Sequence, residues 1–295
     1  MDRSEALVSV EWLAQNLGDP RIRVVDVRWF LPSTGRAGQA EFLAGHLPGA
    51  TFVDLDRDLA GPIRSHGGRH PLPDPGAFAS VLGSCGIGPA THVVAYDDSA
   101  GSTAARLWWM LRQIGHAAAS VLDGGIARWR AEGHPIEIGE PRPQREETYP
   151  TSPFGGFGRT VARDEILPAL DRGAILLDAR APDRFEGRLE PIDPRAGHIP
   201  GARNAPFQGN LTSTVDGVST FLQAHVLRDR FERIGAGSGS RVILSCGSGV
   251  TACHNALAMY LAGLEPPTVY VGSWSDWSSN ADLPIETGPG DGPNG

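Results

Sequence analysis

The amino-acid sequence predicts an α/β fold of two similar domains, each a mainly parallel sheet flanked by helices. Its 295 residues are enough for about two domains. Short runs of Val, Ile and Leu alternate with amphipathic segments such as 104–114 and 252–261, as expected for parallel βαβ units. An internal repeat of about 150 residues is too long for a solenoid and fits a duplicated globular domain.

Four short blocks recur in the same order in both halves, each an apolar strand-like run or a Gly-Pro turn. In order, the pairs are 24–28 with 176–180, 45–50 with 197–202, 93–97 with 242–246, and 121–125 with 269–273. Between the halves, 139–158 carries four prolines among charged and glycine residues and is predicted to be a linker. We therefore predict an N-terminal domain over 1–138, a C-terminal domain over 159–287 and a disordered Gly/Pro-rich tail over 288–295.

The charged residues exclude several kinds of chemistry. The net charge is −8, and all 26 basic residues are arginine, because the chain contains no lysine. A Schiff-base lysine and a P-loop lysine are therefore excluded, and an acidic chain without basic runs is a poor nucleic-acid binder. No apolar stretch is long enough to span a membrane. Any anionic substrate must be held by guanidinium or backbone N–H groups.

Three cysteines, Cys85, Cys246 and Cys253, form no CxxC pair and no four-ligand zinc signature, so we expect no metal and no organic cofactor. An odd count, with no apolar leader behind the first five residues, argues against a disulfide framework and favours a cytoplasmic protein. Cys85 and Cys253 are interpreted as packing residues.

Cys246 is the predicted nucleophile. It follows the apolar run 242–245 and opens a loop, 247–251, that contains two glycines and two hydroxyls and leads into a helical segment. Backbone N–H groups of such a loop, together with the positive end of the helix dipole, stabilise a thiolate. The alternative, a small buried hydrophobe, is the common fate of a free cysteine, but the composition of the loop argues against it.

These motifs resemble those of tandem-domain sulfurtransferases of the rhodanese superfamily. The resemblance rests on the sequences GHLPGA and GHIPGA, on Asp26 and Asp178 after the first strands, on GSWSDW at 272–277 and on CGSGVT at 246–251, and it covers nearly the whole chain. Thiosulfate-using members usually carry Arg and Lys directly after the cysteine, whereas the mercaptopyruvate enzymes carry Gly-Ser-Gly-Val-Thr. This sequence matches the second pattern.

The resemblance implies a set of site residues. Arg184 matches the first family arginine that holds the substrate carboxylate, and Arg195 matches the second by its Pro-Arg context, with Arg188 as a fallback. The backbone N–H groups of the loop are expected to hold the terminal sulfur of the persulfide; the loop residues are Gly247, Gly249, Val250 and Thr251. Thiosulfate is a compact dianion that needs charge within the loop, whereas 3-mercaptopyruvate carries its carboxylate several bonds from the reacting sulfur.

Ser248 resembles the loop serine that the family uses with an aspartate and a histidine of the first domain, here Asp54 and His70. Such a chain could relay protons without the serine attacking the substrate. Asp54 as a capping residue and His70 as a turn residue remain open alternatives. The first domain carries Asp97 where the second carries Cys246, and an aspartate cannot accept a sulfane sulfur, so we expect the first domain to be non-catalytic.

The implied reaction forms a persulfide on Cys246 from a small anionic sulfur donor, 3-mercaptopyruvate, and releases pyruvate. Expected acceptors are a thiol, such as a thioredoxin-like protein, or cyanide. Three alternatives stay open: a thiosulfate:cyanide sulfurtransferase, a Cdc25-like phosphatase, which lacks support because no arginine ends the loop, and a non-catalytic sulfur-sensing or scaffold module.

His46 and His198 recur in both halves, as do the two aspartates, and we predict structural roles for all four.

Overall fold

The computed structural model describes residues 3–212 and 217–290, so the end of the predicted tail, 291–295, lies outside the described residues. The chain divides into two compact units. Unit 1 comprises the described residues of Met1–Gly61, Pro73–Phe157 and Thr212–Phe221, and unit 2 those of Pro62–Leu72, Gly158–Leu211 and Leu222–Gly295. The short segment Pro62–Leu72, which we call the arm, therefore groups with unit 2 although it lies in the first half of the sequence.

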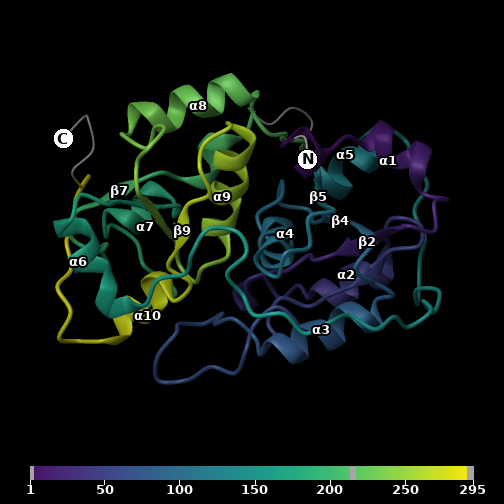
Figure 1. Cartoon of the computed structure of the whole chain (residues 1–295), viewed down its shortest axis with the longest axis horizontal. Helices are drawn as coiled ribbons and strands as arrows, with labels where there is room; N and C mark the ends of the chain where they lie inside the picture. Colours follow the sequence, from purple (N-terminus) through teal and green to yellow (C-terminus); the bar gives the residue numbers. More distant parts are fainter. Residues whose placement is uncertain (1–2, 213–216, 291–295) are drawn as a thin grey trace. The chain divides into compact units, whose positions relative to one another are not determined.

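Unit 1 contains a parallel sheet in the order β1-β5-β4-β2-β3. Its strands are β1 (Leu7–Val8), β2 (Ile22–Asp26), β3 (Thr51–Phe52), β4 (His92–Tyr96) and β5 (Ala119–Leu122). The helices are η1 (Arg3–Ala6), α1 (Val10–Asn16), η2 (Pro32–Thr34), α2 (Gly38–Ala44), α3 (Pro75–Ser84), α4 (Ala104–Gln113) and α5 (Gly125–Ala131). They lie on both sides of the sheet (Figure 1). Helices on both faces explain why the strands are nearly continuous apolar runs.

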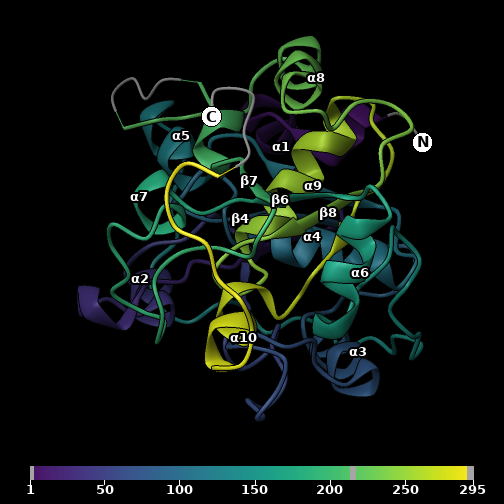
Figure 2. The same ribbon diagram turned by 90° about the vertical axis from the view of Figure 1, so that its left-hand side faces the viewer.

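Unit 2 repeats this topology with the parallel order β7-β6-β8-β9. Its strands are β6 (Ile175–Asp178), β7 (Ala202–Asn204), β8 (Val242–Ser245) and β9 (Thr268–Val269), and a parallel bridge from Thr160 to Val269 stands where β1 pairs with β5 in unit 1. The helices are η3 (Arg163–Glu165), α6 (Ile166–Asp171), α7 (Pro182–Phe185), η4 (Phe207–Asn210), α8 (Ala224–Arg233), α9 (Thr251–Leu261) and α10 (Ser273–Ser279). Figure 2 shows β6 and β8 with α8 and α9 above them and α10 below.

The predicted α/β fold is thus confirmed, and the two predicted amphipathic segments form α4 and α9. Each unit has its own apolar core. In unit 1, Phe42, Tyr96 and Trp129 are among the large buried side chains, and in unit 2 Phe185, Trp274 and Trp277 have this role. Buried aromatic side chains of this size supply much of the hydrophobic stabilisation of a domain.

The repeated aspartates anchor equivalent turns in the two units. Asp26 forms a buried ion pair with Arg28, and Asp178 forms one with Arg180. Each arginine also donates to the carbonyl of the glycine that opens its unit's GHLPGA or GHIPGA block. The guanidinium therefore ties the end of β2 or β6 to the turn that precedes the next strand, and burial without these partners would be costly.

The repeated histidines have matching structural roles. Nδ1 of His46 lies 2.9 Å from the carbonyl oxygen of Phe42, and Nδ1 of His198 lies 2.8 Å from that of Phe185. Each imidazole also stacks on the ring of the phenylalanine whose carbonyl it contacts, with ring centroids 3.9 Å apart for His46 and 3.8 Å apart for His198. The structure gives these residues bracing contacts in both units.

Candidate active site

Cys246 lies directly after β8, which runs between β6 and β9 in the sheet of unit 2. It therefore stands at the carboxyl edge of the strands, where parallel sheets place their ligand sites. The residue is buried, with 1% of its surface exposed. The loop then continues into the first turn of α9, with Val250 and Thr251 at the start of that helix. The partial positive charge of the helix N-terminus favours a thiolate at this position.

Gly249 donates its backbone N–H to the sulfur of Cys246 over 3.1 Å. Its φ of +76° lies in the left-handed region that disfavours side chains. A Cβ at this position would also lie 2.3 Å from the carbonyl oxygen of Val271. Both constraints explain why the loop carries glycine here, and Gly249 is the loop residue whose amide contacts the sulfur directly.

The first turn of α10 holds the nucleophile loop in place. The amide of Cys246 donates to the hydroxyl of Ser273 over 3.0 Å, while Trp274 N donates to the carbonyl of Cys246 over 2.9 Å. Ser275 N donates to the carbonyl of Gly247 over 2.8 Å. The first amide groups of a helix have no partner within the helix, so they are free to bind these loop carbonyls. Residues of the GSWSDW motif thus fix the backbone of the nucleophile loop through hydrogen bonds.

Arg184 reaches the same loop from the neighbouring strand. In the sheet register Asp178 of β6 pairs with Ser245 of β8, so the segments that follow the two strands leave the sheet side by side. Arg184 lies in α7, and its Nη1 is 3.4 Å from the point where a side chain on Gly247 would begin. Its Nη2 is held at 2.7 Å by Glu190, so the guanidinium is oriented by a carboxylate on its far side.

A second guanidinium at the loop was not predicted. Nη2 of Arg69, in the arm, lies 3.3 Å from the same point on Gly247. Nη1 of Arg69 and Nη2 of Arg184 bind the two carboxylate oxygens of Asp193. Burial raises the pKa of the Asp193 carboxyl, and the charge of Arg69 works against that rise. The available signal in the sequence was the position of Arg69 directly before His70.

Arg69 Nη2 and Arg184 Nη1 make no hydrogen bond to another residue of the described chain. Both side chains are part-buried, with 31% and 19% of their surface exposed. Asp193 holds the two cations together through their other nitrogens. The geometry therefore presents two donor faces beside Gly247, next to the sulfur, where an anion would be bound by charge-assisted hydrogen bonds.

Arg195 has a structural position instead of the expected place beside Arg184. Its guanidinium donates to four backbone carbonyls at and after the end of α10, those of Trp277, Ser278, Asn280 and Leu283. These include carbonyls of the last helical turn, which have no partner within the helix. Arg188, the fallback, is exposed and paired with Asp183 and Glu186. The second guanidinium at the loop is thus Arg69.

The structure brings two of the three relay residues together. Nδ1 of His70 lies 2.7 Å from the hydroxyl oxygen of Ser248, and both residues are buried. Asp54 belongs to unit 1, where its Oδ1 accepts the amides of Asp56 and Arg57 in a capping arrangement. His70 itself lies in the arm, which groups with unit 2.

The remaining thiols lie within packed structure. Cys253 is fully buried and donates to the carbonyl of Gly249 over 3.3 Å. Burial also raises the pKa of the Cys85 thiol. In unit 1 the aligned Asp97 is fully buried, and its carboxylate accepts backbone N–H groups of Ser99, Gly101, Thr103 and Ala104. In the unit 1 loop, the Asp97 carboxylate thus has the position that the Cys246 thiol has in the equivalent loop of unit 2.

The described residues form neither a metal site nor a membrane-spanning helix. Across 3–212 and 217–290, His, Cys, Asp and Glu side chains do not gather in threes in a way that would hold a metal ion. Over the same ranges, every helix is too short or too polar to cross a membrane.

Comparison with known proteins gives consistent results. A probable 3-mercaptopyruvate sulfurtransferase of Pseudomonas aeruginosa is 42% identical over 292 residues, which cover 97% of this chain and 99% of the relative. A putative thiosulfate sulfurtransferase of Mycobacterium tuberculosis is 39% identical over 298 residues, covering 97% and 98%. Among solved structures, the 3-mercaptopyruvate sulfurtransferase of Leishmania major is 32% identical with a TM-score of 0.82, covering 95% of this chain and 76% of that one.

The Rhodanese-like domain family matches two stretches of the sequence, 9–132 and 162–280, one in each half of the duplicated chain. These stretches contain the four repeated blocks, the strands β2 to β9 and the Cys246 loop, while β1 (Leu7–Val8) lies just before the first stretch. The relatives named above are sulfurtransferases, which is the class of enzyme implied by the motifs. The chain belongs to the rhodanese-like domain family of sulfurtransferases.

Proposed function

We propose that this protein transfers a sulfur atom from 3-mercaptopyruvate to a thiol or cyanide acceptor through a persulfide on Cys246. The observation that carries the proposal is the surroundings of Gly247 and Cys246. The sulfur accepts the Gly249 amide, two guanidinium groups from other segments lie beside the same loop at Gly247, and the loop itself contains no charged side chain. This combination suits a donor whose anionic group is separated from its reacting sulfur.

In the first half-reaction the Cys246 thiolate attacks the sulfur of 3-mercaptopyruvate. The new S–S bond forms as the C–S bond breaks, and the bonding electron pair stays on carbon as the enolate of pyruvate. A proton on that carbon completes pyruvate, and the enzyme retains the persulfide. Cys246 is the covalent catalyst, and the amide of Gly249 stabilises the negative charge on sulfur.

Arg69 and Arg184 have the role of the anion clamp in this proposal. Their free nitrogens converge beside Gly247, and a carboxylate there would gain two charge-assisted hydrogen bonds. With the carboxylate bound there, the same cations would also act on the adjacent keto oxygen, where the enolate charge develops, and stabilising that charge lowers the barrier to C–S cleavage. Asp193 orients both arginines without occupying the nitrogens that face the loop.

Ser248 and His70 are proposed to supply and remove protons. The hydroxyl of Ser248 stands one residue beyond Gly247, and the imidazole of His70 accepts or donates through the 2.7 Å contact. A proton delivered through this pair would convert the enolate carbon to a methyl group. Asp54 as the third member of the relay stays a prediction, and so does the capping alternative for it.

In the second half-reaction an acceptor thiolate attacks the outer persulfide sulfur, and the Cys246 thiolate is the leaving group. Cyanide in the same role would yield thiocyanate. A thioredoxin-like protein is the expected physiological class of acceptor, and the cytoplasmic location expected from the cysteine content stays a prediction with it. No metal or organic cofactor takes part in either proposed step.

Thiosulfate is a second candidate donor, favoured by a specific observation. The expectation that thiosulfate would be disfavoured rested on a neutral loop, yet two guanidinium groups stand beside that loop at Gly247. One of the relatives bears the name of a putative thiosulfate sulfurtransferase. The two proposals differ in the released product, which is pyruvate from one donor and sulfite from the other.

The deciding experiment measures both donors with the same enzyme. Intact mass after exposure to each donor, followed by digestion, should find one added sulfur on Cys246. Steady-state kinetics should then give a higher kcat/KM with 3-mercaptopyruvate, measured as pyruvate, than with thiosulfate, measured as sulfite. A preference for thiosulfate would overturn the donor assignment and leave the persulfide chemistry intact. An unchanged mass with both donors would overturn the whole proposal.

A further inference from the structure

We infer that the first turn of α10 binds both the arm and the Cys246 loop and thereby positions Arg69 and His70 beside that loop. The positioning residues are Gly68, Ser275 and Asp276. This inference rests on the proposed function, because it explains how the arm serves that site. The arm arrives from a distant part of the sequence, and its contacts to α10 determine where its two functional side chains lie.

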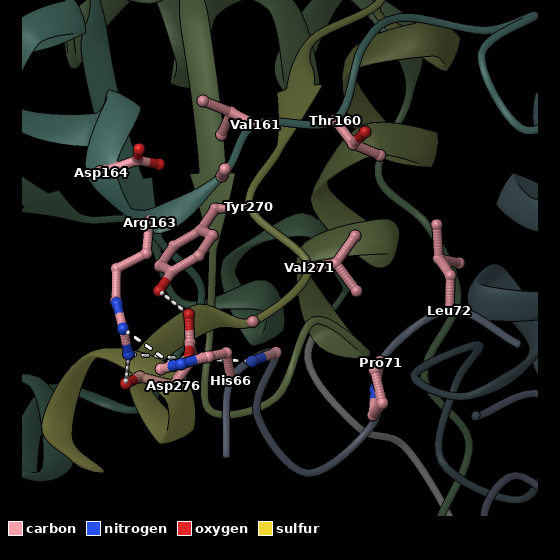
Figure 3. Close-up of a pocket in the computed structure, with 13 residues that line it drawn as sticks. His66, Pro71, Leu72, Thr160, Val161, Arg163, Asp164, Tyr270, Val271 and Asp276 are labelled. Carbon is pink, nitrogen blue, oxygen red and sulfur yellow. Dashed lines mark hydrogen bonds and ion pairs between the residues drawn. The ribbon is translucent and has the colours of Figure 1, made fainter. Parts of the chain in front are cut away.

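Asp276 forms the first contact. Its Oδ1 accepts the amide of Gly67 over 2.9 Å and the Nη1 of Arg163 over 3.1 Å, while its Oδ2 accepts the hydroxyl of Tyr270 over 2.6 Å. Figure 3 shows the Tyr270 hydroxyl and the Arg163 guanidinium meeting the Asp276 carboxylate, with Arg163 also reaching the imidazole of His66. Asp276 is buried, and a buried charge is costly unless it is paired; these donors compensate the charge of its carboxylate. One carboxylate thus links the arm to η3 and α10.

Ser275 and Gly68 form the second contact. The hydroxyl oxygen of Ser275 accepts the amide of Arg69 over 3.1 Å. Gly68, one residue earlier, has a φ of +76°, and a Cβ there would lie 2.4 Å from the carbonyl oxygen of Gly272 and 2.6 Å from the Ser275 hydroxyl. The arm backbone therefore lies flat on the helix, at a distance that only glycine permits.

The same helical turn holds the nucleophile loop. Ser275 donates its backbone amide to the carbonyl of Gly247 while its side chain holds Arg69. A single residue therefore binds the loop with its main chain and the arm with its side chain. Any displacement of the arm changes the distance from Arg69 to Gly247 and from His70 to Ser248, because the loop stays with the helix.

Core packing provides little alternative support for the arm. Its residues His66, Pro71 and Leu72 line a cavity of about 620 Å³ on the side of Thr160 and Val161 (Figure 3). Side chains that line a cavity lack packing partners on that side. The hydrogen bonds to α10 and the close approach of Gly68 therefore have a large share in fixing the arm.

The first test is Gly68→Ala, with Gly173→Ala as the matched control. Both glycines have left-handed backbone angles, +76° and +81°, but a Cβ on Gly173 meets nothing within 4 Å. The two variants share the backbone strain, and only Gly68→Ala also displaces the arm. We expect kcat/KM for 3-mercaptopyruvate to fall about 10- to 100-fold in Gly68→Ala, since a misplacement of roughly 1 Å has effects of this size, and less than about threefold in Gly173→Ala.

The second test is Ser275→Ala, with Ser279→Ala as its control. Each serine hydroxyl donates to the carbonyl three residues earlier, and of the two only Ser275 also accepts the amide of Arg69. Comparing the two variants therefore isolates the contact to the arm. We expect Ser275→Ala to lower kcat/KM about 3- to 10-fold, and Ser279→Ala to change it less than twofold.

A double-mutant cycle separates positioning from lost stability. If Gly68→Ala acts by moving Arg69, then Arg69→Ala should have much less effect in the Gly68→Ala background than in the wild type. Fully multiplicative effects, a Gly68→Ala enzyme no worse than Gly173→Ala, or an Arg69→Ala enzyme of wild-type activity would each overturn the inference. All variants are compared at equal folded fractions, measured by urea unfolding. A wild-type enzyme that gains no sulfur from either donor would instead overturn the proposed function.

Discussion

Replacing Arg69 with alanine tests the anion clamp most cleanly. Arg69 Nη2 is one of the two free guanidinium nitrogens beside Gly247, so its loss should remove one charge-assisted hydrogen bond to the donor. Such a bond contributes about 1.5–3 kcal/mol. Because 31% of the Arg69 side chain is exposed and solvent screens its charge, we expect the lower half of that range, or roughly a 13- to 45-fold fall in kcat/KM.

The stability cost of this change should be modest. Arg69→Ala leaves Asp193 paired with Arg184 Nη2, which stays at 3.0 Å, so no buried carboxylate loses its only partner. Arg184→Ala removes one ion pair from each of two nearly buried carboxylates, leaving Glu190 with Arg180 at 3.4 Å and Asp193 with Arg69, and should therefore reduce stability as well as activity. Arg69→Lys should recover part of the activity, because a point charge replaces a forked donor.

The assay is steady-state pyruvate release over a range of 3-mercaptopyruvate concentrations. Arg188→Ala is the control, since this arginine is also ion-paired but is 57% exposed and has its pairs with Asp183 and Glu186. We expect the control to remain within twofold of the wild type. If Arg69→Ala and Arg188→Ala were equally mild, the donor anion would not be bound at the Gly247 face, and the assignment of the clamp would be refuted.

Three further outcomes are expected. Cys246→Ser should abolish sulfur transfer and leave the urea midpoint unchanged, whereas Cys85→Ser should retain most activity; turnover by the first variant would rule out the nucleophile. Arg195→Ala should lower the free energy of unfolding by about 2–4 kcal/mol, because four carbonyls lose a donor, and a raised KM with normal stability would contradict its structural role. Burial lowers the pKa of His116 and His198 in the folded state. When the pH falls below about 6.5, the ordinary pKa of a histidine, the unfolded state therefore binds more protons than the folded state. Their contribution to stability is present above that pH and is lost as pH falls, which thermal unfolding between about pH 7.5 and 5.5 would detect as a falling midpoint.

The duplication explains why structural residues and site residues could be separated in the sequence. Asp178 and His198 recur in unit 1 as Asp26 and His46, and the structure gives each pair the same contacts. Cys246 has no such counterpart, because Asp97 stands in its place and its carboxylate is saturated by backbone amides. A residue that both copies need for folding recurs in both, whereas a residue needed for chemistry is required in only one.

The α/β fold, the duplication and the loop of the candidate nucleophile could all be predicted from the sequence. These properties depend on local patterns: strand runs with period two or continuous apolar character, helical periodicity, and a cysteine between an apolar strand and a glycine-rich turn. Local patterns of this kind are governed by backbone conformation and burial, which neighbouring residues largely decide. For that reason α4, α9 and the Cys246 loop could be predicted before any contact was known.

Which arginines face the loop depends on long-range contacts that the sequence does not reveal. Arg195 and Arg69 are both ordinary arginines in polar segments, and nothing in their local sequence distinguishes a ligand from a brace. Arg195 is bound by carbonyls more than 80 residues further along the chain, while Arg69 arrives at Gly247 from 178 residues away, the same separation as between His70 and Ser248. Such contacts depend on how the sheet register, α10 and the arm come together in space, and the partners that orient a side chain are supplied by segments remote in sequence.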